Sequence, residues 1–126
     1  MICTDLSKAV QEYLQGELDA SVYIGAVHES SQVTFPAVLV DVKAEPVQNS
    51  ELYKATLTIS VMSQVDTSTN SEHATLTRAV GAAMTSPTIT SSYVQFYGIT
   101  RLPVDESQAD RHWISTLQFI AGVEAI

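Results

Sequence analysis

The sequence predicts an α+β fold: a mainly antiparallel sheet of about five strands with two helices on one face, in the order α-β-β-β-α-β-β. Two segments carry apolar residues at helical spacing, and the others are runs or alternations of β-forming residues. The strands follow one another instead of alternating with helices, which favours antiparallel pairing. Residues 1–126 contain no repeat or linker and predict a single domain.

The first helix carries an apolar stripe of Leu6, Ala9, Val10, Tyr13 and Leu14. Thr4 or Asp5 is its predicted N-cap, and the period fades near Gly16. Two β-rich segments follow, residues 20–27 and 35–47.

Residues 51–64 show the clearest alternation in the chain. One face of this strand is Tyr53, Ala55, Leu57, Ile59 and Val61, and the other is Lys54, Thr56, Thr58 and Ser60. A strand with one polar face is typical of an antiparallel sheet. The preceding residues, 45–51, contain Pro46 and Asn49, which favour a hairpin turn between the two strands.

A second helix is predicted over residues 71–85, where apolar residues again follow a helical period before Pro87. The last two strands are predicted at residues 92–102 and 112–123. The acidic segment 103–111 is expected to join them as a connection.

The polar loop VDTSTNSEH, residues 65–73, raises the question of a calcium site. A helix-loop-helix calcium loop that began at Asp66 would need Gly at its sixth position and Glu at its twelfth, but Ser71 and Thr77 stand there. We therefore interpret the loop as the start of the second helix, with Asp66 and its neighbours as turn and cap residues and Glu72 favourable to the helix dipole.

No motif for catalysis, metal binding or nucleotide binding is recognisable, so we expect no catalytic residue, no metal and no cofactor. The histidines, His28, His73 and His112, lack the spacing of a helical metal pair and are expected at the surface or in packing. Cys3 is the only cysteine, which excludes an internal disulfide. The acidic residues Asp105, Glu106 and Asp110 are expected to form a solvated tip.

The charge and hydropathy of the chain argue against nucleic acid and membranes as binding partners. The chain has 6 Lys and Arg against 14 Asp and Glu, a net charge of -8, and its basic residues are scattered. Binding of nucleic acid as a ligand is therefore not expected, although an acidic wall past which DNA slides is compatible with this charge. No signal peptide is recognisable, and no apolar run approaches the roughly 20 residues that a bilayer requires, so no membrane association is expected.

The last strand carries large apolar residues on both faces. Trp113 shares one face with Leu117 and Phe119, while Ile114 and Ile120 lie on the other. Either helices or a second subunit must cover the Ile114 and Ile120 face, and we favour helices because contacts within a domain are the commoner cause.

The preceding strand, residues 92–102, carries aromatic residues on both of its predicted faces. Tyr93, Tyr97 and Ile99 are predicted on one face, and Phe96 on the opposite face.

The order of elements and several phrases resemble the tail terminators, a family of small neck and tail-completion proteins of tailed bacteriophages. The phrases are SKAVQEYLQGEL, TFPAVLVDVKAEP, YKATLTISVMSQ, SEHATLTRAVGAAM and HWISTLQFIAGV, and they span nearly the whole chain. The resemblance implies a structural virion protein of the tail or neck, made in the host cytoplasm. It implies a six-fold ring that caps the tail tube and joins it to the head connector, with DNA only as passing cargo.

The expected subunit interface combines the acidic segment with aromatic and apolar residues of the last two strands: Asp105, Glu106, Asp110, Arg111, Tyr93, Tyr97, Ile114 and Ile120. Three alternatives stay open. One is a tail tube or other neck subunit, the second is a small α+β enzyme or ligand-binding domain with an unrecognised pocket, and the third is a toxin-antitoxin or adaptor domain.

Overall fold

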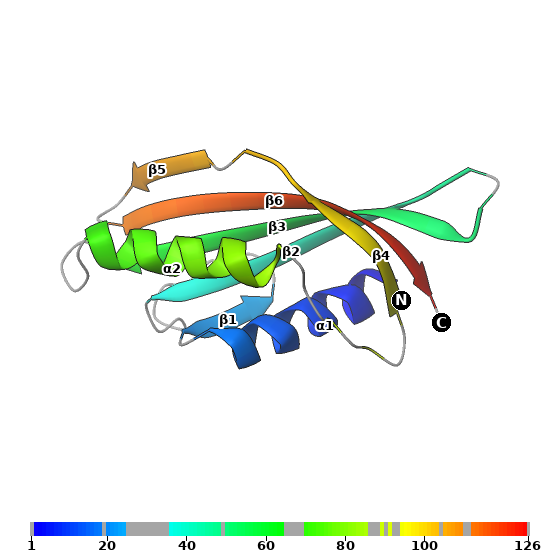
Figure 1. Cartoon of the computed structure of the whole chain (residues 1–126), viewed down its shortest axis with the longest axis horizontal. Coiled ribbons are helices and arrows are strands. Elements are labelled where there is room, and N and C mark those ends of the chain that lie inside the picture. Colours follow the sequence, from blue (N-terminus) through cyan, green and yellow to red (C-terminus); the bar gives the residue numbers. More distant parts are fainter. Residues whose placement is uncertain are drawn as a thin grey trace.

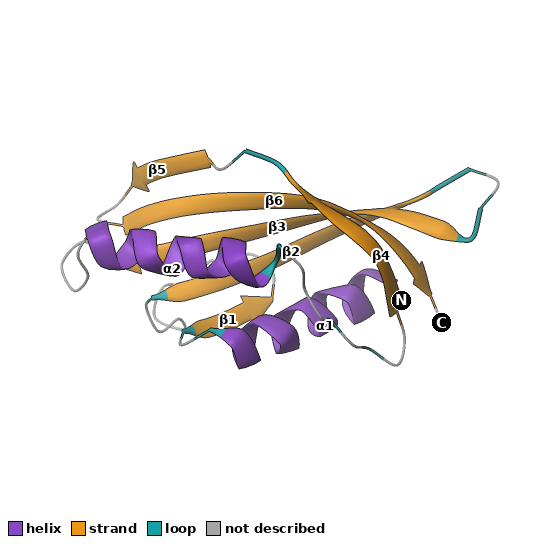
Figure 2. Ribbon diagram, viewed as in Figure 1, coloured by secondary structure: helices purple, strands orange, loops and turns teal. Residues whose placement is uncertain are grey.

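In the part of the chain that the computed structural model describes, two helices pack on one face of a six-stranded sheet (Figure 1). The structure describes residues 2–18, 20–24, 36–48, 50–64, 70–85, 89, 91, 94–103, 105–109 and 112–125, and for residues 70 and 105–109 it describes the backbone only. Figure 2 shows both helices on the same side of the strands. The predicted α+β class is confirmed.

The strands are β1 (Ser21–Ile24), β2 (Ala37–Pro46), β3 (Leu52–Gln64), β4 (Val94–Arg101), β5 (Asp105–Ala109) and β6 (His112–Ala125). Their order across the sheet is β1-β2-β3-β6-β4, and β5 also pairs with β6. β1 runs parallel to β2, whereas the other pairings are antiparallel. β3 pairs over its whole length with residues 112–124 of β6, and the two strands form the centre of the sheet.

The helices are α1 (Ile2–Glu17) and α2 (Asn70–Ala83). α1 begins before the predicted cap residues, so Asp5 lies within its first turn, where a carboxylate is favourable to the helix dipole. α2 agrees closely with its predicted range. The Tyr13 hydroxyl donates a hydrogen bond of 2.7 Å to the Ala83 carbonyl and thereby links α1 to the end of α2.

The core lies between the helices and the sheet. It is one cluster that includes the apolar stripe of α1, Val80 and Met84 at the end of α2, and the alternating residues of the strands. On β3, Ala55, Leu57, Ile59 and Val61 are fully buried, as the alternation predicts. Leu117 and Phe119 of β6 lie on the same face and are also fully buried.

The predicted hairpin joins β2 to β3. Its strands pair from Ala37↔Met62 to Pro46↔Tyr53. The Val47 N–H donates to the Leu52 carbonyl at 2.9 Å, and the Leu52 N–H donates to Ser50 Oγ at 3.0 Å. In Figure 1 the tip of this hairpin extends past the ends of β4 and β6.

The acidic segment 103–111 contains a strand that was not predicted. β5 pairs with residues 112–116 of β6, and β4 pairs with residues 119–125 along the same edge. Between them, the Leu102 N–H donates to the Gln118 carbonyl at 2.8 Å, so the edge is nearly continuous. This segment has few β-forming residues, and its strand depends on the partner that β6 provides.

The predicted grouping of Ile99 with Tyr97 is wrong. Phe96 pairs with Val123 and Ile99 pairs with Ala121, so three steps along β4 match two steps along β6. The additional residue is a β-bulge, which moves Ile99 to the core face that Phe96 occupies. Gly98 lies in the bulge with a φ of 97°, a backbone conformation that favours glycine.

The preference for helices over the Ile114 and Ile120 face is also wrong. Both described helices pack on the opposite face, against Leu117 and Phe119. Ile114 and Ile120 remain half-buried, because only neighbouring strands flank them among the described residues. We call this sheet face, opposite the helices, the outer face.

Candidate assembly surface

The outer face is polar in its middle and apolar toward both ends. The residue pairs Ser60↔Thr116 and Thr58↔Gln118 of β3 and β6 form the polar part. Met62 pairs with Ile114 on one side of it, and Thr56 pairs with Ile120 on the other. This face contains no described helix, so its half-buried side chains are available to another molecule.

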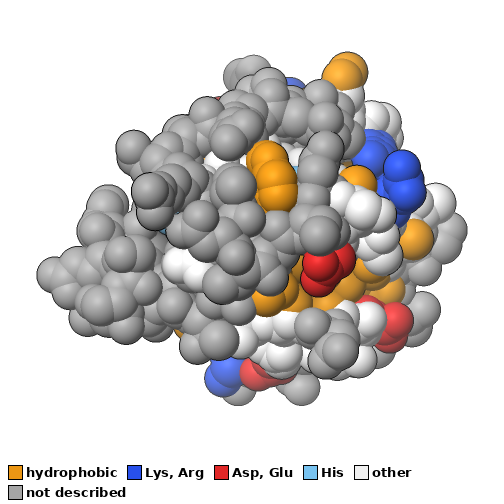
Figure 3. Space-filling model, turned by 90° about the vertical axis from the view of Figure 1, so that its left-hand side faces the viewer, with side chains coloured by type: hydrophobic (Ala, Val, Ile, Leu, Met, Phe, Trp, Pro, Cys, Tyr) orange, Lys and Arg blue, Asp and Glu red, His pale blue; other side chains and the backbone are white. Residues whose placement is uncertain are grey.

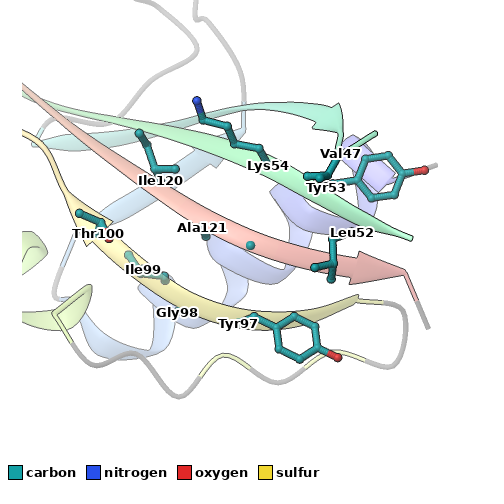
Figure 4. Close-up of a pocket in the computed structure, with 11 residues that line it drawn as sticks. Val47, Leu52, Tyr53, Lys54, Tyr97, Gly98, Ile99, Thr100, Ile120 and Ala121 are labelled. Carbon is teal, nitrogen blue, oxygen red and sulfur yellow. The ribbon is translucent and has the colours of Figure 1, made fainter. Parts of the chain in front are cut away.

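One end of the outer face is hollowed into a groove of about 430 Å³, which we call the hairpin groove (Figure 4). Its lining comes from the β2–β3 hairpin, from β4 and from β6: Val47, Leu52, Tyr53, Lys54, Tyr97, Gly98, Ile99, Thr100, Ile120, Ala121 and Gly122. Figure 4 shows Leu52 of β3 and Tyr97 of β4 on either side of β6. The groove therefore joins segments that are far apart in the sequence.

The bulge of β4 shapes this groove. Tyr97 directly follows Phe96, which packs against the core, so it lies on the outer side, opposite Gly122 of β6, and the bulge after it returns the chain to the core face at Ile99. A Cβ added to Gly122 would lie 3.5 Å from Tyr97 Cβ, so the absence of a side chain there leaves space beside Tyr97. Gly98 and Gly122 both line the groove, and neither carries a side chain that would fill it.

Tyr97 is positioned by an acid of the last strand. Its hydroxyl donates a hydrogen bond of 2.6 Å to Glu124 Oε2. This bond, with smaller contributions from desolvation and from the negative charge of Glu124, raises the pKa of Tyr97 above its ordinary value of 10.0. The tyrosine is therefore neutral at physiological pH and presents its ring to solvent.

The hairpin groove gathers most of the exposed apolar side chains. Among the described residues, the exposed large hydrophobic residues are Val47 (42%), Leu52 (37%), Tyr97 (50%) and Ile24 (51%). All but Ile24 line the groove. A cluster of this kind on a small protein indicates a surface that binds another macromolecule.

The structure brings together part of the predicted interface. Tyr97 and Ile120 both line the hairpin groove, whereas Ile114 lies on the outer face toward its other end. Asp105 and Glu106 belong to β5 and pair with Thr116 and Ser115. Tyr93, Asp110 and Arg111 lie outside the described residues.

Sequence reasoning missed the hairpin contribution to this surface. Val47 and Leu52 flank the polar turn, and the sequence pattern predicts Val47 only as the end of a strand. Apolar residues on both sides of a polar hairpin turn are a sequence signal for an exposed apolar patch, because the neighbouring segments of the chain predict no element that would cover the hairpin tip.

His73 forms the most buried polar cluster of the described residues. Its Nδ1 is hydrogen-bonded with Ser63 Oγ and its Nε2 with Ser115 Oγ, each at 2.9 Å. Its ring also lies 6.1 Å from that of Trp113, between ring centroids. Both serines are only 1% exposed, so the cluster is shielded from solvent. The cluster attaches the first turn of α2 to β3 and β6, and the expected packing role of His73 is confirmed.

The remaining sequence candidates give no second site. His112 is half-buried at the start of β6, and His28, Asp66 and Ser68 lie outside the described residues. No group of three or more His, Cys, Asp or Glu that could hold a metal ion occurs among the residues that the structure describes. Within the same part of the chain, neither helix has the length and apolar character needed to cross a bilayer.

Charged side chains do not form one broad surface on the face that Figure 3 shows. Among the described residues visible there, the Lys and Arg side chains and the Asp and Glu side chains lie in small separate groups. This distribution agrees with the scattered basic residues of the sequence.

Comparisons with known proteins identify the fold. No protein-family model matches the chain, and no curated protein sequence matches it. Among solved structures, it is similar to a chain of "Virion of native gene transfer agent (GTA) particle", with a TM-score of 0.66 and 18% identity. The match covers 93% of this chain and 96% of that chain. The two chains therefore share one fold over nearly their whole lengths.

Proposed function

We propose that this chain is a structural virion protein that acts as a tail terminator. Copies of it form a ring, six-fold in the expected arrangement, that caps the tail tube and joins it to the head connector. The observation that supports this most is the shared fold with a chain of a virion particle over nearly the whole length. The fold likeness and the resemblance to tail terminators point to the same class of protein independently.

The surface of the chain supports assembly. The outer face has no helix over it among the described residues, and the hairpin groove concentrates exposed apolar side chains at one end. A closed ring uses one contact repeated around an axis, and such a contact needs exposed apolar area of this kind.

The charge of the chain supports passage of DNA. A net charge of -8 per subunit, repeated around a ring, gives a strongly acidic assembly. Such a wall repels the phosphate backbone and prevents DNA from binding as it moves through. The acidic strand β5 is one segment that would contribute to the wall.

A small enzyme is the alternative from a different class, and the Ser63, His73 and Ser115 cluster would be its natural centre. Both nitrogens of His73 are engaged by buried serine hydroxyls, which favours a structural role for the cluster.

Mass in solution tests the proposal. The purified chain is expected to form a single species whose mass is a fixed multiple of 13.6 kDa, and ring-shaped particles in negatively stained images. Long filaments would instead support a tail tube subunit. A monomer at all concentrations would contradict the proposal.

A further inference from the structure

We infer that Gln11 and Gln15 of α1 take the place of a further strand at the β1 edge of the sheet, and that they keep this edge from accepting a strand of a second copy. The described sheet ends at β1 on this side. The inference goes beyond the proposed function, because it concerns how the sheet of each single chain is closed.

The backbone of β1 faces two sides. β1 pairs with β2 in parallel, with Val22 opposite Val38. In a parallel strand, the N–H and the C=O of one residue point to the same side, and those of the next residue point to the other side. Both groups of Val22 are hydrogen-bonded to α1, so they face away from β2. Val22 is only 5% exposed, so these groups need partners within the chain.

Gln15 makes the hydrogen bonds of a residue in a parallel strand. Its Nε2 donates to the Ala20 carbonyl at 2.9 Å, and its Oε1 accepts from the Val22 N–H at 3.0 Å. A strand residue opposite Ser21 would make the same two bonds through its own N–H and C=O. The carboxamide of glutamine offers the same kinds of donor and acceptor as a peptide group. Gln15 therefore replaces one residue of a neighbouring strand.

Gln11 continues this pattern along β1. Its Nε2 donates to the Val22 carbonyl at 3.1 Å, which is the bond that the N–H two residues further along a parallel strand would make. Gln11 and Gln15 are four residues apart, so they project from the same side of α1. Figure 2 shows α1 alongside β1. Three backbone groups of the β1 edge are thus occupied by side chains of the same chain.

This occupation closes an edge that another chain could otherwise extend. Unpaired backbone groups at a sheet edge accept strands of other molecules, and proteins protect such edges with short strands, bulges or covering segments. β1 has four residues, and its outward groups at Ala20 and Val22 are already bonded. At the other end of the sheet, β4 contains the bulge at Gly98. A second copy is the strand donor that the glutamines exclude, because it carries the same edge wherever the protein gathers.

Amide hydrogen exchange, followed by NMR, tests whether Gln15 occupies the edge. In Gln15→Leu, the Val22 N–H loses its acceptor and is expected to exchange about ten-fold faster. The Tyr23 N–H is the control within the same strand, because it faces β2, and its exchange should stay as in the native chain. An unchanged rate at Val22 would show that another group covers the edge. Equal acceleration at both residues would show that Gln15 only holds β1 in place. Either result would overturn the inference.

Sedimentation velocity over a range of concentrations tests whether the open edge takes a strand. The variant is Gln11→Leu/Gln15→Leu, and the matched control is Lys8→Leu/Glu12→Leu. Each adds two leucines four residues apart on α1 and leaves the net charge unchanged. We expect the variant to form species of at least about twice the native mass, because two β1 edges can then pair. The control should keep the native mass, and circular dichroism of both should match that of the native chain.

The remaining outcomes separate this inference from the proposed function. A variant that keeps the native mass would show that the glutamines do not prevent strand addition. Equal growth of the control would assign the association to added apolar surface and would also overturn the inference. Both comparisons are made against the native species, so a native chain that forms no ring would contradict the proposed function and leave the closure of the β1 edge standing.

Discussion

The two faces of β6 differ although they belong to one strand. On the helix side, Leu117 and Phe119 are fully buried in the core. On the outer side, Gln118 is exposed and Thr116 and Ile120 are half-buried beside the hydroxyl-bearing residues of β3. Among the described elements, folding buries one face completely and leaves the other partly exposed, which under the proposed function separates residues needed for stability from residues needed for assembly.

The largest loss of stability is expected on the buried face of β6. Phe119→Ala should lower the free energy of unfolding by about 4 kcal/mol, because it removes a fully buried ring from the core. Its neighbour on the outer side is the matched control: Ile120→Ala should lower the same quantity by about 1 kcal/mol or less. Urea unfolding of both variants measures the difference. Equal losses would mean that the two faces contribute alike to stability.

A smaller loss of stability is expected at the buried polar cluster that His73 forms with Ser63 and Ser115. His73→Leu leaves the hydroxyls of Ser63 and Ser115 buried with no imidazole, and should lower the free energy of unfolding by about 2–4 kcal/mol. Thermal and urea unfolding measure this loss.

Two controls show whether the hydroxyls are the cause. Thr75→Ala, on the exposed side of the same helix, should change the free energy of unfolding by about 0.5 kcal/mol or less. Adding Ser63→Ala and Ser115→Ala to His73→Leu should recover part of the loss, because no unsatisfied hydroxyl then remains. A triple variant that is no more stable than His73→Leu would contradict this explanation.

The smallest effect on stability is expected on the outer face, at the hydrogen bond between Tyr97 and Glu124. The Tyr97 hydroxyl donates to Glu124, so the folded chain holds this proton more tightly than the unfolded chain and the pKa of Tyr97 is raised. The contribution to stability is therefore complete below pH 10.0, the ordinary value, and is lost as the pH rises through the folded pKa. An NMR titration of the ring should show Tyr97 ionising late, and Glu124→Gln should return the pKa toward the ordinary value. An unchanged titration in Glu124→Gln would exclude the carboxylate as the cause.

Much of the fold follows from local patterns. The period of two in β3 predicted both of its faces, because successive side chains of any strand point in opposite directions. The spacing of Leu6, Val10 and Leu14 predicted α1 and its buried stripe in the same way. For the candidate site, alternation predicted that Ile120 lies on the face opposite Leu117 and Phe119, which the register confirms, but it predicted neither the exposure of Tyr97 nor an outer face without a helix over it among the described residues.

Other features depended on contacts between distant segments. β5 has the composition of a loop and becomes a strand because β6 offers it an edge. The bulge at Gly98 changes the face of Ile99 only because β4 must stay in register with β6. The sequence by itself determined which residues alternate and which repeat at helical spacing, since these depend on neighbours along the chain. Only the tertiary structure decided which sheet face the helices cover, and with it which apolar residues remain exposed, because that choice depends on packing between elements.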